Sequence, residues 1–256
     1  MLMIRTAAAG RGAAWLLEAF QYFSKAAITW LGVVFILLII VILSALLPMA
    51  GIVLQILTPV LIGGLMLGCK EATAPGGQFQ LNHLFAGFSQ NTGNLVILGV
   101  LHTLGTVIIV ALMVIMVIVV LGSMALLAAI MDGDTSLLLE NLLAMLLVVL
   151  MGMLLYLPLL MAFWFAPALV MLEGQTAIGA IKYSFVGCLK NVVPFLVYGI
   201  VALPLCLLAT MPFMLGWFIL IPMTIASFYT GYREIYWVED KPALIEVNHV
   251  TQAPAT

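Results

Sequence analysis

The stretch AIKYSFVGCLKNVVPFLVYG, Ala180 to Gly199, decides the fold, because a related pattern opens each third of the chain. Its first half places Ile181, Phe185 and Leu189 at helical spacing, with lysines near the polar edge. This arrangement is typical of an amphipathic helix that lies in a membrane interface. Its second half is apolar and begins a membrane span. The stretch therefore predicts a cationic surface helix that continues into a transmembrane helix.

Composition places the whole chain in a membrane. Hydrophobic residues make up 66% and charged residues 7% of the 256 residues, and the mean hydropathy is +1.31. A soluble domain is about 45–50% apolar and about 25% charged. Apolar runs of roughly 20 residues, long enough to cross about 30 Å of hydrocarbon, recur along nearly the entire length. We expect about six spans, a start that is not cleaved, and no soluble catalytic domain.

These runs predict an all-α, polytopic membrane fold with six transmembrane helices, arranged as three hairpins that are each preceded by an amphipathic helix on the cytoplasmic face. The hairpin units are residues 11–71, 78–172 and 174–236 within a single membrane domain, 1–236. Residues 237–256 are expected to form a flexible cytoplasmic tail. The spans themselves are predicted at about 26–47, 52–69, 95–131, 137–172, 192–210 and 217–232.

The third and fourth apolar runs are too long for straight spans. Each has about 36 residues, which would reach roughly 54 Å at 1.5 Å per residue. We therefore expect tilting, folding back, or bends at Pro158 and Pro167, with the apolar surplus near the turn lying in the outer interface or against a partner. In the second span, the pattern Gly64-x-x-x-Gly68 favours close helix contact, although glycine-rich spans often match it by chance.

An internal repeat underlies the three-hairpin prediction. A shift of 65 residues places Leu16, Phe20, Phe23 and Ser24 over Leu81, Phe85, Phe88 and Ser89. A shift of 100 residues places Phe85, Gly87, Asn91 and Gly99 over Phe185, Gly187, Asn191 and Gly199. Lys25, Gln90 and Lys190 then share one column. The alternative is that any apolar chain produces such matches.

The charged residues predict the orientation. In a six-span arrangement all eight cations fall on one side, and the positive-inside rule then places both termini in the cytoplasm. The opposite turn carries Asp132, Asp134 and Glu140. These carboxylates either gather a hard cation or form a solvated turn. We favour the solvated turn and predict no metal site. The cations are Arg5, Arg11, Lys25, Lys70, Lys182, Lys190, Arg233 and Lys241.

Two groups of residues are candidates for function. His102, with Thr103 and Thr106 nearby, is an ionisable group inside a span, which suggests a proton relay or a polar ligand contact. The alternative is a structural histidine that donates to a neighbouring helix carbonyl. The second group could contact anionic lipid headgroups at roughly 1 kcal/mol per charge near the surface, or could serve only to fix orientation. It comprises Lys25, Lys182, Lys190 and Arg233.

No pattern in the chain names a reaction. It has no nucleophile with a base partner, no HExxH, no P-loop and no GxGxxG in a fitting context. Cys69, Cys188 and Cys206 are odd in number and widely spaced, which favours buried small residues over disulfides or zinc. A net charge of -2 without a basic patch argues against nucleic acid. We predict a protein that is not an enzyme and has no cofactor.

The chain resembles a family of uncharacterised six-span inner-membrane proteins of Gram-negative bacteria. The resemblance spans nearly the whole length and lies in WLLEAFQYFSK from Trp15, LTPVLIGG from Leu57, HLFAGF from His83, FAPALV from Phe165, KNVVPFLVYG from Lys190 and LGWFILIPMTIASFYTGYREIY from Leu215. Ala26 and Ala27 stand where that family has Asn-Pro or Gln-Pro, which weakens the expected helix break there. The chain is also distantly similar to membrane domains attached to some glycerophosphodiester phosphodiesterases, which implies lipid-related work.

Two functions remain open at this level. The first is an accessory or scaffold protein that binds membrane lipids, other membrane proteins or a second copy of itself, because catalytic and charged intramembrane groups are scarce. The second is a transporter or flippase for a small or lipidic substrate, suggested by the repeat, the prolines in the spans and His102. A membrane-spanning cavity lined by His102, Thr103 and Thr106 would favour transport.

Overall fold

The computed structural model describes residues 2–47, 49–121, 131, 142–211 and 213–236. Within these ranges the chain is helical and contains no strand. The elements are α1 (Arg11–Lys25), α2 (Ala27–Leu46), α3 (Ala50–Glu71), the 3₁₀ helix η1 (Leu81–Phe88), α4 (Thr92–Leu121), α7 (Leu142–Phe163), α8 (Ala166–Glu173), α9 (Ala177–Lys190), α10 (Val192–Thr210) and α11 (Trp217–Tyr236). The predicted all-α class is confirmed.

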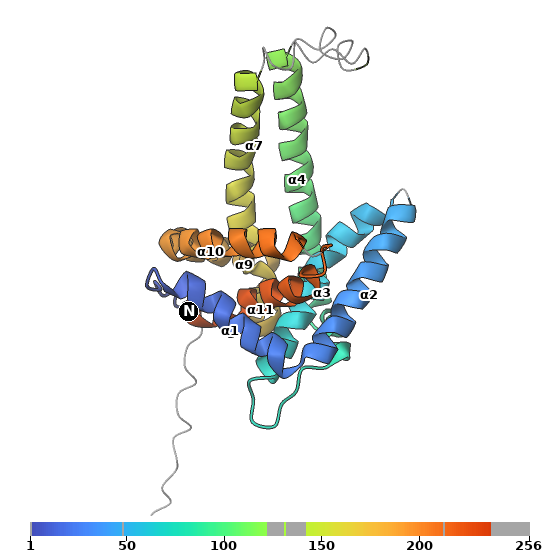
Figure 1. The fold of residues 1–256 in the computed structure, drawn as a ribbon, viewed down its shortest axis with the longest axis vertical. Helices are drawn as coiled ribbons and strands as arrows, with labels where there is room; N and C mark the ends of the chain where they lie inside the picture. The colour runs from blue at the N-terminus through green and yellow to red at the C-terminus, as the bar shows by residue number, and fades with distance from the viewer. Residues whose placement is uncertain (1, 48, 122–130, 132–141, 212, 237–256) are drawn as a thin grey trace, which may run out of the picture.

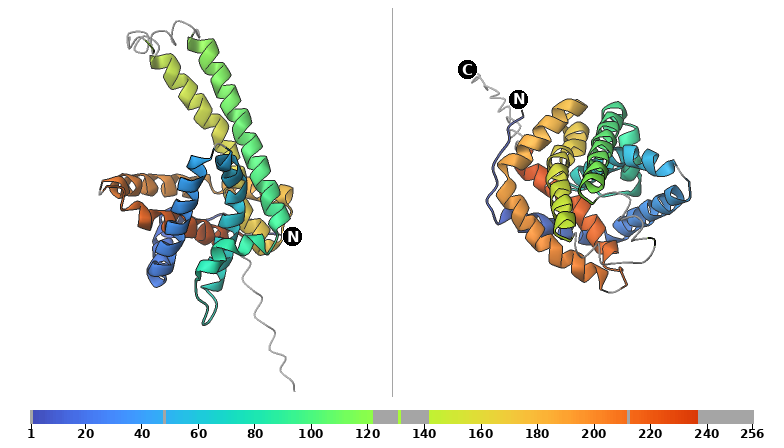
Figure 2. Two further views of the ribbon diagram at one scale, coloured as in Figure 1. Left: turned by 90° about the vertical axis from the view of Figure 1, so that its right-hand side faces the viewer. Right: turned by 90° about the horizontal axis from the view of Figure 1, so that it is seen from above.

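The helices form a broad base from which one antiparallel pair projects (Figure 1). Helices α4 and α7 run side by side and extend well beyond the turn of the α2–α3 pair. Small residues let them pack, since Gly105 lies against the side chain of Leu159 and Gly152 against that of Met113. Helices α1, α10 and α11 lie across the direction of α4 and α7, as the view from above shows (Figure 2).

Five helical stretches are long and apolar enough to cross a membrane. They are Ala27–Leu46, Ala50–Glu71, Thr92–Val119, Leu146–Glu173 and Val192–Thr210. The sixth predicted span, 217–232, is not confirmed. Helix α11 occupies it, but this helix buries polar residues such as Ser227 and Thr230 against the protein and carries Arg233 near its end.

The overlong third and fourth segments behave differently from each other. Helix α4 continues unbroken for 30 residues, about 45 Å at 1.5 Å per residue, which exceeds the hydrocarbon thickness of about 30 Å. The fourth segment instead breaks at Trp164 and Phe165, where α8 begins with Pro167 in its first turn. Pro158 lies inside α7. The predicted acidic turn with Asp132, Asp134 and Glu140, and the predicted tail 237–256, lie outside the described residues.

The predicted repeat coincides with the points where helices break. Three spans begin at Ala27, Thr92 and Val192, positions that are separated by the shifts of 65 and 100 residues found in the sequence. At the last junction Asn191 is fully buried, and its side chain bonds the backbone of Arg5, Ala7 and Gly187. The leading elements differ, however, because η1 is a short 3₁₀ helix where an amphipathic α-helix was expected. The organisation into three equivalent hairpins stays a prediction.

Glycines allow the closest backbone contacts of the base. The Gly64-x-x-x-Gly68 pattern does mark a close contact, but its partner is η1: a Cβ on Gly64 would collide with the backbone oxygen of His83. From the other side, a Cβ on Gly87 would collide with the backbone oxygen of Val60. These contacts press η1 onto α3. Helix α4 approaches α3 as closely, since a Cβ on Gly99 would collide with the backbone oxygen of Ile56.

Candidate functional site

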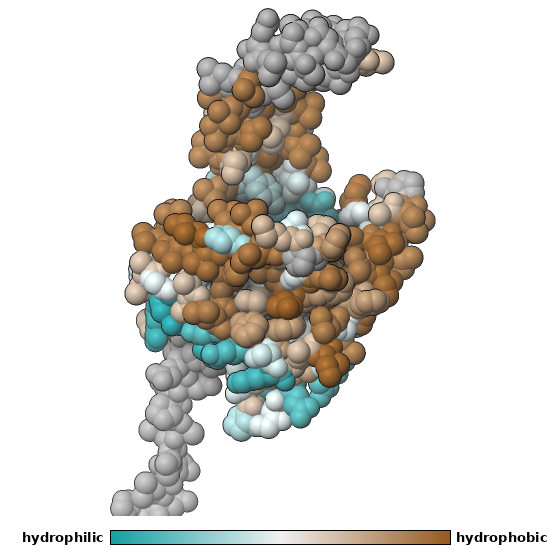
Figure 3. All heavy atoms as spheres, viewed as in Figure 1, coloured by the Kyte–Doolittle hydropathy of each residue, from teal (hydrophilic) through white to brown (hydrophobic). Residues whose placement is uncertain are grey.

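Hydrophilic side chains gather at the end of the molecule opposite the projecting α4–α7 pair (Figure 3). At this end an open cavity of about 720 Å³ lies between the α1–α2 junction, the loop that follows α3, and α11. We call it the polar cavity. The residues of its lining with polar side-chain atoms are Glu18, Gln21, Tyr22, Lys25, Thr29, Trp30, Thr73, Gln78 and Arg233.

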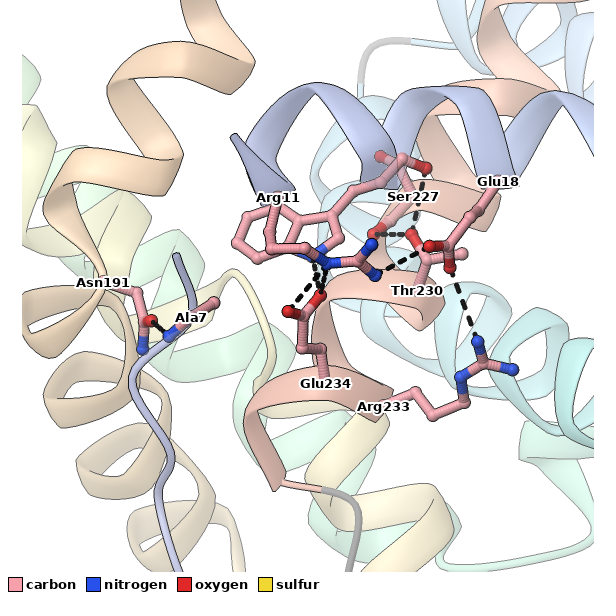
Figure 4. Close-up of polar contacts among 9 residues, drawn as sticks. Ala7, Arg11, Glu18, Asn191, Ser227, Thr230, Arg233 and Glu234 are labelled. Atoms are coloured by element: carbon pink, nitrogen blue, oxygen red, sulfur yellow. Dashed lines mark hydrogen bonds and ion pairs between the residues drawn. The ribbon is translucent and has the colours of Figure 1, made fainter. Parts of the chain in front are cut away.

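A charged network beside the polar cavity joins α1 to α11 (Figure 4). Arg11 donates from Nε to the carboxylate of Glu234 at 2.8 Å and from Nη2 to Glu18 Oε1 at 2.7 Å. The hydrogen bond that Arg11 donates to Glu234 is the main cause that raises the pKa of Arg11. Trp15 Nε1 donates to Glu234 at 2.7 Å, and Arg233 Nη2 approaches Glu18 Oε2 at 3.4 Å. The Glu18 carboxylate of the cavity lining is therefore already engaged by two guanidinium groups.

Lys25 reaches the cavity because the chain turns sharply after it. Helix α1 ends at Lys25, and Ala26 leaves the helical region with φ -137° and ψ 39° before α2 starts. The break forms although alanines stand where the resembling family has proline. Lys25 is exposed and forms no ion pair within the described part of the chain. Its ammonium group is thus available to a ligand.

Trp30 forms an unusual part of the cavity wall. Its side chain is 1% exposed and stacks on Phe79, with ring centroids 4.1 Å apart and planes inclined by 13°. Its Nε1–H is buried and meets no acceptor among the residues that the structure describes. The indoles of Trp15 and Trp217, in contrast, donate to Glu234 and Thr210. A buried donor without a partner costs free energy.

The loop side of the cavity is held by His83, which the sequence analysis did not single out. Its Nε2 lies 2.9 Å from Glu71 Oε2, and its Nδ1 accepts from the backbone N–H of Gln80 at 3.0 Å. Because Nδ1 accepts, the ring is the neutral Nε2–H tautomer and donates to Glu71. Thr73 Oγ1 lies 3.4 Å from the hydroxyl of Tyr229. These contacts tie both ends of the 72–80 loop to the helices around it.

Tyr22 adds a phenol to the lining. Burial is the main cause that raises its pKa, so the hydroxyl stays protonated at neutral pH and can donate a hydrogen bond. Its ring meets that of Tyr229 edge to face at 5.8 Å. The phenol is held in place by packing.

The structure divides the four predicted headgroup contacts. Lys25 and Arg233 line the same cavity although 208 positions separate them (233 − 25). Lys182 and Lys190 are exposed on α9, which contributes no residue to this cavity. The two α9 lysines therefore belong to a different surface.

The predicted intramembrane site, His102, Thr103 and Thr106, lies on α4, and its role stays a prediction. The ring of His102 packs edge to face against Phe163 at 5.0 Å. The hydroxyls of Thr103 and Thr106 donate to carbonyl oxygens one turn earlier in α4, at 2.8 and 2.9 Å. Thr106 borders an apolar crevice of about 290 Å³ between α4 and α7, whose lining includes neither His102 nor Thr103.

The remaining candidates for chemistry are sparse in the described ranges. Cys69 and Cys188 are buried and free, and Cys206 is partly exposed and free. Across those ranges no group of three His, Cys, Asp or Glu residues is placed to hold a metal ion.

The fold and the site together define a multi-pass helical membrane protein with a polar cavity at one end. The chain is 28% identical over 257 aligned residues to a protein of Burkholderia thailandensis whose name is "Probable inner membrane protein", and the alignment covers 91% of this chain and 93% of that one. No family model matches the sequence. No solved structure matches it significantly. The relative and the apolar helices support an inner-membrane protein, and nothing in these comparisons supports the distant similarity to phosphodiesterase-linked membrane domains.

Proposed function

We propose that this chain is a non-enzymatic accessory protein of the bacterial inner membrane that binds membrane lipids, and through them or its apolar helices other membrane proteins. The observation that carries the proposal is the polar cavity. It opens where an amphipathic helix meets the first span, at the depth where lipid headgroups meet water. Its lining holds Lys25, which forms no ion pair in the described part of the chain, and Arg233, which makes one 3.4 Å contact with Glu18. Such cations are suited to anionic lipids, which attract basic groups near a membrane surface.

Lipid that copurifies with the protein tests this function. We expect the full chain, extracted from native membranes in mild detergent, to retain phospholipid through repeated washing, with anionic species enriched over their share in the membrane. Mass spectrometry of the purified sample and of the whole membrane extract gives the two compositions. The same composition in both, or no retained lipid, would contradict the proposal. Transport of substrate by reconstituted liposomes that His102→Ala abolishes would favour the transporter alternative instead.

The proposed orientation has both termini in the cytoplasm, because the cations lie on one side of the predicted topology. We expect a reporter fused after Asp134 to score periplasmic and one fused after Thr256 to score cytoplasmic. A cytoplasmic score after Asp134 would reverse the orientation.

A cysteine at Phe213, which is 94% exposed in the turn between α10 and α11, tests the sixth span. If α10 and α11 both cross the membrane, Phe213→Cys reacts with a membrane-impermeant thiol reagent added outside spheroplasts. If they lie along the inner face, it reacts only after lysis. Unsubstituted protein, whose Cys69 and Cys188 are buried and whose Cys206 is partly exposed, is the control for background labelling.

A further inference from the structure

We propose that the polar cavity recognises the phosphate group of an anionic phospholipid headgroup, with Lys25, Arg233 and Trp30 as its principal donors. This inference rests on the proposed lipid-binding function and names the chemistry of that site. Free phosphate offers the same chemistry, and the experiment below separates the two sources.

The charges in the lining favour an anion. Lys25 and Arg233 contribute two positive charges, and Glu18 is the single carboxylate among the lining residues. That carboxylate accepts from Arg11 at 2.7 Å and lies 3.4 Å from one nitrogen of Arg233. Arg11 is shared between Glu18 and Glu234, so the two guanidinium groups and two carboxylates of this network balance, and Lys25 adds one positive charge at the cavity. The single 3.4 Å contact with Glu18 leaves most of the Arg233 donors to a ligand. Planar guanidinium and ammonium donors are the usual partners of phosphate oxygens.

The uncharged donors point the same way. Trp30 belongs to the lining; its Nε1–H is buried and meets no acceptor among the described residues, and an indole can only donate. Its ring is held by the stack on Phe79, so it cannot turn away to find water. Tyr22, protonated at neutral pH, is a lining residue from α1 with a hydroxyl that can donate. An oxyanion accepts hydrogen bonds and can satisfy these donors. A cation, or an apolar ligand without acceptor atoms, cannot.

The surroundings suit a headgroup with attached chains. A volume of about 720 Å³ exceeds what one phosphate ion fills. Apolar side chains next to the lining are also exposed: Ile28 is 88% exposed on α2, and Leu81, which contacts Gly32 of α2, is 45% exposed. Lipid chains can follow this apolar flank while the phosphate stays in the cavity. A soluble anion would make no use of it.

Ligand-induced stabilisation of the full chain in detergent tests the proposal, because a ligand that binds only the folded state raises the unfolding temperature. The probes are short-chain phosphatidylglycerol, short-chain phosphatidylcholine and inorganic phosphate. We expect phosphatidylglycerol to raise the midpoint of thermal unfolding far more than phosphatidylcholine. Inorganic phosphate should have little effect. An equal shift with inorganic phosphate would overturn the assignment to a lipid headgroup.

Variants locate the binding. The double variant Lys25→Ala/Arg233→Ala should weaken the apparent affinity for phosphatidylglycerol by about ten- to a hundredfold, since two charge-assisted contacts are lost. The matched control Lys182→Ala/Lys190→Ala removes the same positive charge from α9 and should bind as the unsubstituted protein does. Equal losses in both double variants would overturn the cavity in favour of general surface attraction.

Trp30→Phe separates a ligand contact from a structural role. It keeps an aromatic ring against Phe79 but removes the donor, so it should weaken phosphatidylglycerol binding without lowering the unfolding temperature of the ligand-free protein. Unchanged binding by Trp30→Phe would remove Trp30 from the site. If the Lys25→Ala/Arg233→Ala variant fails to fold, Lys25→Gln supplies a milder variant. If phosphatidylglycerol stabilises every variant equally, lipid binding stands and the cavity assignment fails. If no lipid stabilises or copurifies with any form, the proposed function itself fails.

Discussion

Gly99→Ala is expected to destabilise the protein by about 3 kcal/mol or more, at the upper end of what overpacking a core costs. Gly99 is buried in α4 where that helix crosses α3, and an added Cβ would collide with the backbone oxygen of Ile56. A backbone carbonyl within a helix cannot turn aside as a flexible side chain can. The two helices must therefore separate, and the packing of η1 and α8 against α3 is disturbed with them.

Gly199→Ala is the matched control, because Gly199 occupies the same column of the sequence repeat in α10 and an added Cβ there meets nothing within 4 Å. Alanine is the better helix former by up to about 1 kcal/mol, so this variant should be as stable as the original or slightly more stable. Thermal unfolding of both variants in one detergent, followed by tryptophan fluorescence, measures the difference. Equal midpoints would show that α3 and α4 do not approach each other as closely as described.

This pair of glycines shows what the sequence could and could not predict. The repeat made Gly99 and Gly199 equivalent, and it coincides with the helix starts at Thr92 and Val192, although hydropathy had predicted that the first of these spans begins at about residue 95. Which glycine is packed depends on the helix that crosses it, and crossing angles are set by contacts between distant segments. Spacing along one helix carries no information about them.

The number of spans reveals a similar limit. Hydropathy predicted five spans that the structure supports by length and composition, because the hydrocarbon requires about 20 apolar residues whatever their partners are. The sequence of α11 met the same criterion over 217–232, where Tyr229 and Tyr232 count as apolar. In the structure these rings are buried against the protein, so they say nothing about lipid. Burial by protein and burial by lipid look alike in a sequence.

The candidate site could be predicted only in part. The positive-inside pattern singled out Lys25 and Arg233 as cations near a membrane surface, and both line the polar cavity. It gave Lys182 and Lys190 equal weight, because charge alone does not distinguish a cavity from an open surface. The sequence did not mark Trp30 as a candidate site residue, since tryptophans are common near the ends of membrane spans. Its significance comes from an unpartnered Nε1–H, which only three-dimensional contacts reveal.

Glu234→Ala is expected to loosen α1 from α11 and to lower stability by about 2 kcal/mol, within the range of about 1–3 kcal/mol for a buried donor left unsatisfied. Two interactions end at this carboxylate: the ion pair with Arg11 and the hydrogen bond from Trp15 Nε1. Arg11 is 39% exposed at its side chain and keeps Glu18 as a partner, so the lost ion pair accounts for about 1 kcal/mol or less. Trp15 is 1% exposed and has no alternative acceptor in the network. The loss of the Trp15 hydrogen bond, and not the loss of the Arg11 ion pair, should therefore account for most of the destabilisation.

Three further variants test which interaction dominates: Glu234→Gln, Trp15→Phe, and Trp15→Phe combined with Glu234→Ala. Glu234→Gln removes the charge but keeps an oxygen that can accept from Trp15, so it should retain most of the stability that Glu234→Ala loses. In a Trp15→Phe background there is no indole donor to strand, and Glu234→Ala should then cost no more than the ion pair, about 1 kcal/mol or less. Thermal unfolding of the four proteins in this cycle gives the coupling between the two positions. The opposite result would be that Glu234→Gln is as unstable as Glu234→Ala, or that Glu234→Ala lowers stability equally in both backgrounds. The ion pair with Arg11 would then be what holds α1 in place. In that case the wall of the polar cavity would depend on salt concentration, because exposed ion pairs are screened.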